Sequence, residues 1–415
     1  MKIIVVGAGH IGTIITRELA ASPEVTWLRT VDVHAQALER LEALFSGPSG
    51  HGGLNRPELV HLSGLEVDDY QAAMAGFDVA VLALPTRLAS YRAIEAAIRE
   101  GVQVVDILEE YHRRPEAGDR EELDIPPRMT PEEYGEDLHR RAIEAGIIVL
   151  DGMGFAPGLT NVTLGEGIRA LDEAHSAIAR AGGIPNKESA ARHPLGYMIT
   201  WAFDHVLRLY VMPSLILQDG QLVEAQALTG RESLHFQALG RDEHLEVAIT
   251  PGMPSFVHTR PHLREFAEKT IRWPGHWAAV DALKEAGMLD LEPVEIDGHH
   301  IVPRDFLVAT LAPRLRPLPG DGDACIMWNT VTGIKDGQPA RLDYLMWEEA
   351  DPHTRISAMG RVTAYPAAVG ALLVGRGLIA EKGIVAPEDA IYGESYRVLL
   401  DELSQRGITI EERRA

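Results

Sequence analysis

The chain of 415 residues has one cysteine, Cys325, so an internal disulfide is excluded and a reducing compartment is expected. Its longest apolar stretch, around residues 364–374, is too short to cross a bilayer. No basic cluster offsets the formal net charge of −22, which would repel nucleic-acid phosphates. No signal peptide precedes the first predicted strand. We therefore expect a cytoplasmic protein with neither a nucleic-acid nor a membrane partner.

Several catalytic signatures are also absent. The sequence has no GxSxG elbow and no P-loop. His258 and His262 have helical metal-ligand spacing, but Pro261 lies between them and no acid or cysteine cluster completes a site. His299 and His300 are adjacent and would point to opposite faces of a strand. The sequence therefore predicts no metal site.

The strongest positive signal is at the start of the chain. An apolar run, residues 3–6, leads into Gly7-x-Gly9-x-x-Gly12 and then a helical pattern. Such glycines let the backbone approach a pyrophosphate at a helix N-terminus. Asp32 ends the next predicted strand, where an acid accepts the ribose hydroxyls of NAD and disfavours the extra phosphate of NADP. The pattern predicts an NAD site, with NADP less favoured; the alternative is an ordinary strand-turn-helix with a surface aspartate.

Residues 1–155 alternate predicted strands and helices, as a parallel doubly wound sheet requires. Strands are predicted at 25–31, 77–84, 102–106 and 147–150, and helices at 13–20, 89–100 and 130–145. Thr130 and Pro131 form a helix start, with a threonine cap followed by proline. Ligands bind beyond the carboxyl ends of such strands. We therefore expect one crevice to be ringed by Gly7, Asp32, Pro85, Asp106 and Asp151.

The following region, residues 156–355, has a different pattern. Three Asp-Gly pairs, at 219–220, 297–298 and 336–337, separate strand-like runs and predict tight hairpins. We expect an α+β domain with a mixed or antiparallel sheet, interrupted by helices at 262–269 and 276–286. Residues 356–415 are predicted to form helices, at 364–375 and 394–406, that return to the first domain. The charged, proline-containing segment 108–137 is either a solvated excursion or a lid over the crevice.

One segment leaving the last strand of the first domain is a candidate ligand contact. Residues 151–161 contain three closely spaced glycines, among them Gly154, and one proline, Pro157, and end in Thr160 and Asn161. Thr160 or Asn161 could cap a helix and offer amides to a ligand. A glycine-rich hinge between domains is the alternative interpretation.

This segment, with others in order along nearly the whole chain, resembles the saccharopine dehydrogenase family, and within it the lysine 6-dehydrogenases. The matching stretches are GAGHIG (7–12), GFAPGLTN (154–161), GGIP (182–185), PLGY (194–197) with Trp201, KTIRWPGH (269–276), PRD (303–305), GRG (375–377) and KGI (382–384) with PE (387–388). The resemblance implies a Rossmann domain, an inserted α+β domain with substrate contacts and a subunit interface, and NAD-linked oxidation at a carbon bearing an amine. A homodimer or larger homo-oligomer is expected on the same basis.

The resemblance also implies site residues. Arg272 would hold the substrate carboxylate, or else form an internal ion pair. Tyr197 and Trp201 would line the substrate pocket, or else pack in the core. Asp106 would hold the substrate ammonium or accept a proton, unless it caps a helix. His276 would be the acid/base, unless it is structural. Asn161 is the remaining substrate-binding candidate, and the predicted cofactor contacts are Gly7, Gly9, His10, Ile11, Gly12, Asp32, Leu84, Pro85, Gly154 and Pro157.

Three functional hypotheses follow. The first is oxidative deamination of the distal amine of L-lysine or a related amino acid, which yields a semialdehyde, ammonia and NADH. The second is oxidation of a secondary amine such as saccharopine, because residues 193–201 are also similar to the corresponding stretch of saccharopine-forming enzymes. That substrate would need a second carboxylate clamp, for which Arg192, Arg208 and Arg304 are candidates. The third is a non-catalytic NAD-binding protein.

Overall fold

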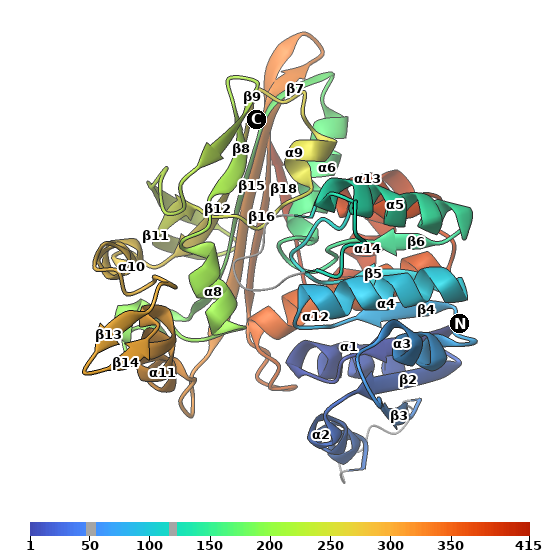
Figure 1. Ribbon diagram of the computed structural model, residues 1–415. Helices are drawn as coiled ribbons and strands as arrows, with labels where there is room; N and C mark the ends of the chain where they lie inside the picture. The colour runs from blue at the N-terminus through green and yellow to red at the C-terminus, as the bar shows by residue number, and fades with distance from the viewer. Residues whose placement is uncertain (47–54, 116–122) are drawn as a thin grey trace. The chain divides into compact units, whose positions relative to one another are not determined.

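The computed structural model describes residues 1–46, 55–115 and 123–415, and the chain forms two compact units. Unit 1 comprises residues 1–166, 253–259 and 360–408, and unit 2 comprises residues 167–252, 260–359 and 409–415. The predicted divisions after residues 155 and 355 did not include the short return of residues 253–259 to unit 1. Figure 1 shows the elements of both units.

The described residues of unit 1 form a parallel sheet of seven strands in the order β17-β6-β5-β4-β1-β2-β3. Its strands are β1 (Lys2–Val6), β2 (Trp27–Asp32), β3 (Glu58–His61), β4 (Val79–Leu82), β5 (Gln103–Asp106), β6 (Ile148–Leu150) and β17 (Gly383–Val385). Its helices are α1 (His10–Ala21), α2 (Ala35–Ser46), α3 (Val67–Met74), α4 (Arg87–Glu100), α5 (Pro131–Glu144), α9 (Phe256–Thr259), α12 (Ala358–Gly375), α13 (Pro387–Ala390) and α14 (Gly393–Gln405). The predicted Rossmann architecture is confirmed.

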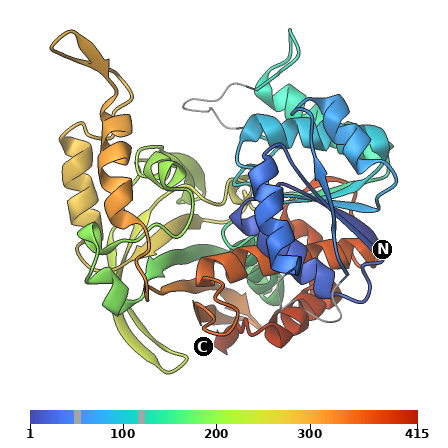
Figure 2. The ribbon, with the colours of Figure 1, turned by 90° about the horizontal axis from the view of Figure 1, so that it is seen from below.

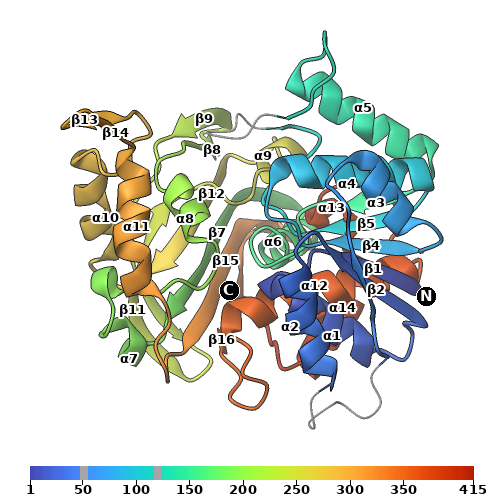
Figure 3. The same cartoon turned by 60° about the horizontal axis from the view of Figure 1, so that its bottom comes forward.

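Helices cover both faces of this sheet. Figure 3 shows α3, α4 and α5 on one face and α1, α12 and α14 on the other. The central strands are mostly apolar, and all four residues of β4 and all three of β6 are buried, because a doubly covered parallel sheet has no wet face. Thr130 caps α5 as predicted, since its side chain accepts a hydrogen bond from the amide of Glu133.

Helix α12 is longer than the apolar run around residues 364–374 indicated. It has 18 residues and is apolar enough to cross a membrane by length and composition alone. However, 89% of it is buried inside the structure. Gly370 lets this helix approach the sheet, since a Cβ there would meet Met153, Leu150 and Val105 within 4 Å. The burial identifies α12 as a core helix.

Unit 2 is built on a mixed sheet of nine strands. The main order is β10-β11-β12-β7-β15-β16-β18, with β8 paired to β12 and to β9. Its strands are β7 (Glu173–Pro185), β8 (Ser214–Gln218), β9 (Gln221–Ala225), β10 (Glu232–Ala238), β11 (Arg241–Ile249), β12 (Glu265–Arg272), β15 (Asp323–Lys335), β16 (Gln338–Glu349) and β18 (Glu411–Arg414). Only β12 and β7 pair in parallel; the other pairs are antiparallel.

The remaining elements of unit 2 pack beside this sheet. They are α7 (Lys187–Ala190), η1 (Pro194–Gly196), α8 (Phe203–Leu209), α10 (His276–Glu285), α11 (Pro303–Leu315) and the hairpin β13–β14 (Val294–Ile296 and His299–Ile301). Figure 2 shows this hairpin projecting from the ends of α10 and α11. Helix α6 (Leu159–Ala170) begins in unit 1 and ends in unit 2.

The three predicted Asp-Gly hairpins are confirmed. Asp219, Asp297 and Asp336 have φ of 52°, 49° and 50°, and the glycine after each also has a positive φ. Two consecutive residues with positive φ define the tight turn that best matches the twist of the flanking strands.

One predicted helix was wrong. Residues 262–269 were expected to be helical, but residues 265–272 form strand β12. The stretch contains good helix formers, yet it pairs with β11 on one side and β7 on the other. Pairing on both edges overrides the weak local preference.

Candidate functional site

The glycine-rich loop of unit 1 has the geometry of a dinucleotide cradle. Gly7 has φ of 105°, and a Cβ there would lie 2.4 Å from the carbonyl oxygen of Ala83. A Cβ on Gly12 would lie 1.9 Å from the carbonyl oxygen of Gly7. Gly9 is exposed, with nothing within 4 Å of its missing Cβ. The outer glycines therefore allow close packing, while Gly9 leaves open space at the start of α1, where a pyrophosphate fits.

Asp32 lies at the end of β2 beside this loop. Its carboxylate accepts hydrogen bonds from the backbone amides of Ala8 and His34, both at 2.7 Å. These bonds fix the carboxylate at the position where an adenine-ribose diol binds in this fold. His10 and Ile11 form the first turn of α1, with His10 exposed and Ile11 half-buried.

The other four predicted cofactor contacts lie at two places in unit 1. Leu84 is half-buried and Pro85 is exposed, just before α4. Gly154 and Pro157 are buried in a loop that closes on itself, because the Gly154 amide donates to the Pro157 carbonyl at 3.0 Å. The first pair is open to a ligand, whereas the second shapes the turn into α6.

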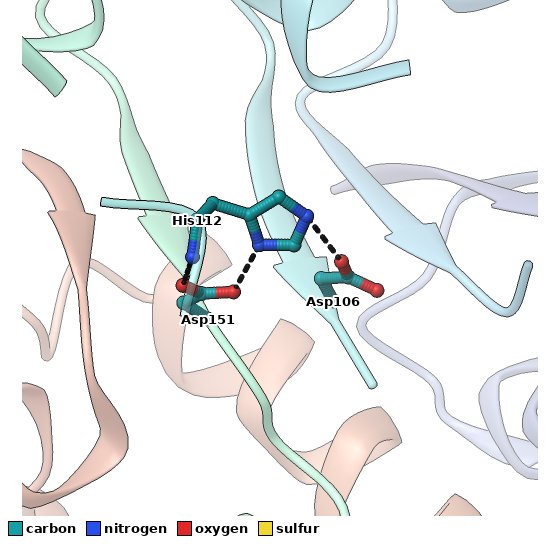
Figure 4. A group of neighbouring side chains, drawn as sticks. All are labelled: Asp106, His112 and Asp151. Carbon is teal, nitrogen blue, oxygen red and sulfur yellow. Dashed lines mark hydrogen bonds and ion pairs between the residues drawn. The ribbon is translucent and has the colours of Figure 1, made fainter. Parts of the chain in front are cut away.

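A buried cluster of polar side chains lies beyond the carboxyl ends of β5 and β6 (Figure 4). Asp106 ends β5 and Asp151 directly follows β6. His112 lies between them, with Nδ1 2.6 Å from Asp151 Oδ1 and Nε2 3.5 Å from Asp106 Oδ2. Ser90 of α4 donates to Asp106 at 2.5 Å and lies 3.0 Å from His112 Nε2. Asp106, His112 and Ser90 are completely buried.

The protonation of this cluster follows from its contacts. Burial alone would lower the pKa of His112, but the Asp151 and Asp106 carboxylates outweigh it and raise that pKa to about 9. Burial raises the pKa of Asp106, although His112 and Ser90 act against the rise. His112 is therefore an imidazolium at neutral pH, held between two acids.

Asp106, His112 and Asp151 each offer a ligand atom, all within 4.8 Å of one another. However, His112 directs its two different ring nitrogens to the two carboxylates. One ion cannot bind both nitrogens of one ring, because their lone pairs point in different directions. The arrangement is a hydrogen-bonded proton chain, and its geometry does not match a mononuclear metal centre.

A second buried cluster is in unit 2, around Arg272 at the end of β12. The guanidinium lies 5.2 Å from the ring centroid of Tyr197, 6.0 Å from that of Tyr210 and 5.7 Å from that of Trp277. Arg272 is only 4% exposed. Its Nε donates to the Tyr210 hydroxyl at 3.2 Å, and Nη1 donates to the carbonyls of Ile271 and Gly183 at 2.9 and 3.4 Å.

Among the described residues, no acidic partner accompanies the positive charge of Arg272. Within the described ranges it forms no ion pair with aspartate or glutamate, so the internal ion pair considered from the sequence is not present there. In the same described part, the Tyr197 hydroxyl and the Trp277 indole N–H are buried with no hydrogen-bond partner. A buried cation and two unused donors form a site for an anion.

His276 helps to orient this site. Its Nδ1 lies 3.1 Å from the carbonyl of Leu195, and its Nε2 lies 3.0 Å from the Tyr210 hydroxyl. Burial and the adjacent Arg272 lower the pKa of His276 to about 3, so the ring is neutral at physiological pH. Both nitrogens are engaged, with Nδ1 donating and Nε2 accepting. This geometry favours a positioning role over the acid/base role predicted from the sequence.

The last two substrate-binding candidates are in different units. Trp201 is half-buried in unit 2, and its ring lies 5.2 Å from that of His205. Trp201 also packs against the apolar cluster that contains Tyr197. Asn161 is completely buried in unit 1, where its amide donates to Glu388 at 2.8 Å and to Ser255 at 3.1 Å. Its side-chain oxygen accepts from the Gly158 amide at 3.0 Å, so Asn161 stabilises the start of α6.

The structure thus divides the predicted residues between the units. Arg272, Tyr197, His276 and Trp201 lie together in unit 2, while Asp106, Asn161 and all the cofactor candidates lie in unit 1. Sequence reasoning missed His112, Ser90, Tyr210 and Trp277. His112 belongs to a segment interpreted as solvated or lid-like, of which residues 116–122 lie outside the described residues. A histidine six residues after a strand end was the only available signal.

Comparisons with known proteins agree with this arrangement. The family model described as the saccharopine dehydrogenase NADP-binding domain matches residues 3–150, and the model of the C-terminal domain matches residues 154–408. Carboxyaminopropylagmatine dehydrogenase from Synechocystis is 22% identical over 406 residues, which cover 94% of this chain and 92% of that protein. The solved structure of saccharopine dehydrogenase (L-Glu forming) from Saccharomyces cerevisiae has a TM-score of 0.76 at 18% identity, with 100% of this chain and 99% of that chain covered. The chain therefore belongs to the saccharopine dehydrogenase family and is an NAD(P)-dependent amino acid dehydrogenase.

Proposed function

We propose that this enzyme oxidises the distal carbon–nitrogen bond of an amino acid that carries one carboxylate near Arg272. The main support is the Arg272 guanidinium, which is buried without an acidic partner in the described residues. It lies next to two hydrogen-bond donors that have no acceptor, the Tyr197 hydroxyl and the Trp277 indole N–H. A carboxylate would neutralise the charge and accept from the guanidinium, Tyr197 and Trp277. Unit 2 would thus supply the substrate anchor, and unit 1 the cofactor cradle.

The preferred cofactor in this proposal is NAD. When bound, NAD supplies the acceptor for the hydride that leaves the substrate carbon. The Asp32 carboxylate, fixed by two backbone amides, would accept from a ribose diol and repel a phosphate at the same place. The Gly7 to Gly12 loop would hold the pyrophosphate.

The first candidate substrate is L-lysine. Its distal ammonium must lose a proton before hydride loss, because only the free amine supports the developing imine. Water then hydrolyses the imine, so lysine, NAD and water give the semialdehyde, ammonium, NADH and the one proton that the substrate ammonium released first. His276 is neutral but fully engaged, and Asp106 is enclosed, so neither side chain is exposed to solvent as a proton acceptor.

The second candidate is a secondary amine. It is supported by the names of two similar proteins, one acting on saccharopine and one on a carboxyaminopropyl group joined to agmatine. Two of the arginines proposed for a second carboxylate clamp have other partners: Arg192 pairs with Asp321, and Arg304 Nε donates to the Leu289 carbonyl at 3.1 Å. Arg208 lies on α8. The ion pair with Asp321 therefore disfavours Arg192 as a second carboxylate clamp.

The test is NADH formation by the purified protein with NAD and, separately, L-lysine, L-ornithine, saccharopine, carboxyaminopropylagmatine and putrescine, with ammonia assayed in parallel. Equal NADH and ammonia from L-lysine would establish the first candidate. NADH without ammonia from a secondary amine would establish the second. Turnover of putrescine, which has no carboxylate, equal to that of lysine would contradict the role of Arg272. NADH binding without turnover of any amine would indicate a non-catalytic protein.

Assembly and context complete the proposal. We also propose a homodimer or larger homo-oligomer and a role in lysine metabolism, which the resemblance to the family implies. A cytoplasmic location is proposed because the chain has a single cysteine. Analytical ultracentrifugation at several protein concentrations tests the assembly, since a monomer throughout would contradict it.

A further inference from the structure

The His112 cluster joins three segments at the edge of the sheet where Rossmann folds bind their ligands. Ser90 belongs to the first turns of α4, Asp106 ends β5, and Asp151 follows β6. Leu84 and Pro85, two predicted cofactor contacts, directly precede α4. Ligands of open parallel sheets bind beyond the carboxyl ends of the strands. The cluster therefore braces the part of unit 1 from which the cofactor contacts project.

His112 is the only one of these residues that contacts both acids through its ring. Besides Nδ1, its backbone amide donates to Asp151 Oδ2 at 2.9 Å, so His112 binds both oxygens of that carboxylate. On the other side, Asp106 accepts from Ser90 and, at 3.1 Å, from the Leu108 amide. The ring is thus fixed from both ends, and the chain between β5 and His112 is fixed with it.

When Asp106 is ionised, the hydrogen bonds of the cluster are satisfied by a doubly protonated ring. Ser90 has one hydroxyl proton, which it donates to Asp106. Its oxygen can then accept only from a protonated His112 Nε2, while Nδ1 needs a proton to donate to Asp151. Loss of the Nε2 proton would leave a lone pair facing the Ser90 oxygen, and one bond of the brace would be lost.

We propose that His112 is a positioning residue for dinucleotide binding: its imidazolium ties β5, β6 and α4 together, and NADH affinity depends on that charge. The inference rests on the cofactor site of the proposed function and is independent of the amine substrate. The charged and titratable groups that face His112 are Asp106, Asp151, Glu110 and Tyr91. Glu110 is neutralised by Arg87, with Nε 2.7 Å from its carboxylate, so the two aspartates dominate.

The test compares NADH affinity with pH in the wild-type protein and in His112→Asn. Asparagine can still donate to Asp151 but does not titrate in this range. Fluorescence titration of NADH from pH 7.5 to 10 should show affinity falling about five- to tenfold in the wild type, with its midpoint near the pKa of His112 of about 9. His112→Asn should bind more weakly at pH 7.5 and show no such fall. His300→Asn, an exposed histidine on β14, is the matched control and should behave as wild type.

Two further measurements test the role of His112 without any substrate. Nitrogen NMR of histidine-labelled wild-type protein should show both His112 ring nitrogens protonated up to about pH 8. Ser90→Ala, which removes the oxygen that accepts from Nε2, should move the fall in NADH affinity to lower pH. A His112 ring already neutral at pH 7.5, or the same pH dependence in wild type, His112→Asn and Ser90→Ala, would overturn the proposal. These readouts do not involve amine oxidation. They can therefore contradict the role of His112 while the proposed function stands, and the proposed function can fail while the role of His112 stands.

Discussion

The two units bury positive charge in opposite ways. In unit 1, His112 lies between two carboxylates and its hydrogen-bonding groups are satisfied inside the protein. In unit 2, Arg272 lies among aromatic rings without an acidic partner in the described residues, next to donors that have no acceptor. A paired buried charge holds segments together, whereas an unpaired one has a cost that a ligand can offset. The His112 cluster of unit 1 is therefore a structural brace, whereas the Arg272 cluster of unit 2 has the properties of a binding site.

Breaking the brace should have the largest effect on stability. Asp151→Asn leaves the buried His112 ring without its closest carboxylate, and removal of one member of a buried pair costs about 3–5 kcal/mol. We expect the free energy of unfolding in urea at pH 7 to fall by about that amount. Asp68→Asn, which alters an exposed ion pair with Arg99, should leave the midpoint unchanged. Equal losses in both variants would contradict the comparison.

Removing the Arg272 charge should lower activity and leave stability unchanged or higher, the opposite of the result expected for the His112 cluster. Arg272→Met keeps most of the side-chain volume and deletes a buried charge that has no acidic partner in the part of the chain that the structure describes. We expect kcat/KM for the amino acid substrate to fall about thirty- to a thousand-fold, because a substrate carboxylate loses its partner. This fall corresponds to a loss of about 2–4 kcal/mol of binding free energy in the transition state. Thermal stability should stay level or rise. A large loss of stability with unchanged kcat/KM would show that Arg272 is structural.

The pH dependence of stability sharpens the contrast further. The folded protein holds the His112 proton to about pH 9, whereas an unfolded histidine loses it near the ordinary histidine pKa of 6.5. The stability from this group is complete below pH 6.5 and is lost as the pH rises to about 9, at up to about 1.4 kcal/mol per pH unit. Urea titrations across this range should show that decline in the wild type. His112→Asn should lack it, and an equal decline in that variant would assign it to other groups.

The smallest effect is expected from Tyr210→Phe. This change removes the hydroxyl that accepts from Arg272 and lies 3.0 Å from His276 Nε2. Arg272 keeps its charge and its carbonyl acceptors, so only orientation is weakened. We expect KM for the amino acid to rise about two- to tenfold, the value of one hydrogen bond, with little change in kcat. An unchanged KM would remove Tyr210 from the site.

Local patterns were enough for most of the secondary structure. The Gly7 to Gly12 loop, the α5 capping box and the Asp-Gly turns all depend on interactions within a few residues, and each was predicted correctly. Strand β12 was mistaken for a helix because its strand character comes from two neighbours distant in sequence. Strand β17 was missed for a similar reason, because its three residues form a strand only through their pairing with β6.

Local sequence patterns also predicted only part of the candidate site. The sequence alone determined the nucleotide-binding architecture, the cofactor class and the family, because these depend on short motifs in a fixed order. It also singled out Arg272 and His276. Only the tertiary structure decided that Arg272 lacks an acidic partner in the described residues, that His276 is neutral, and that His112 is charged. Those properties depend on burial and on atoms brought from distant segments, and a protonation state is set by the environment that folding creates.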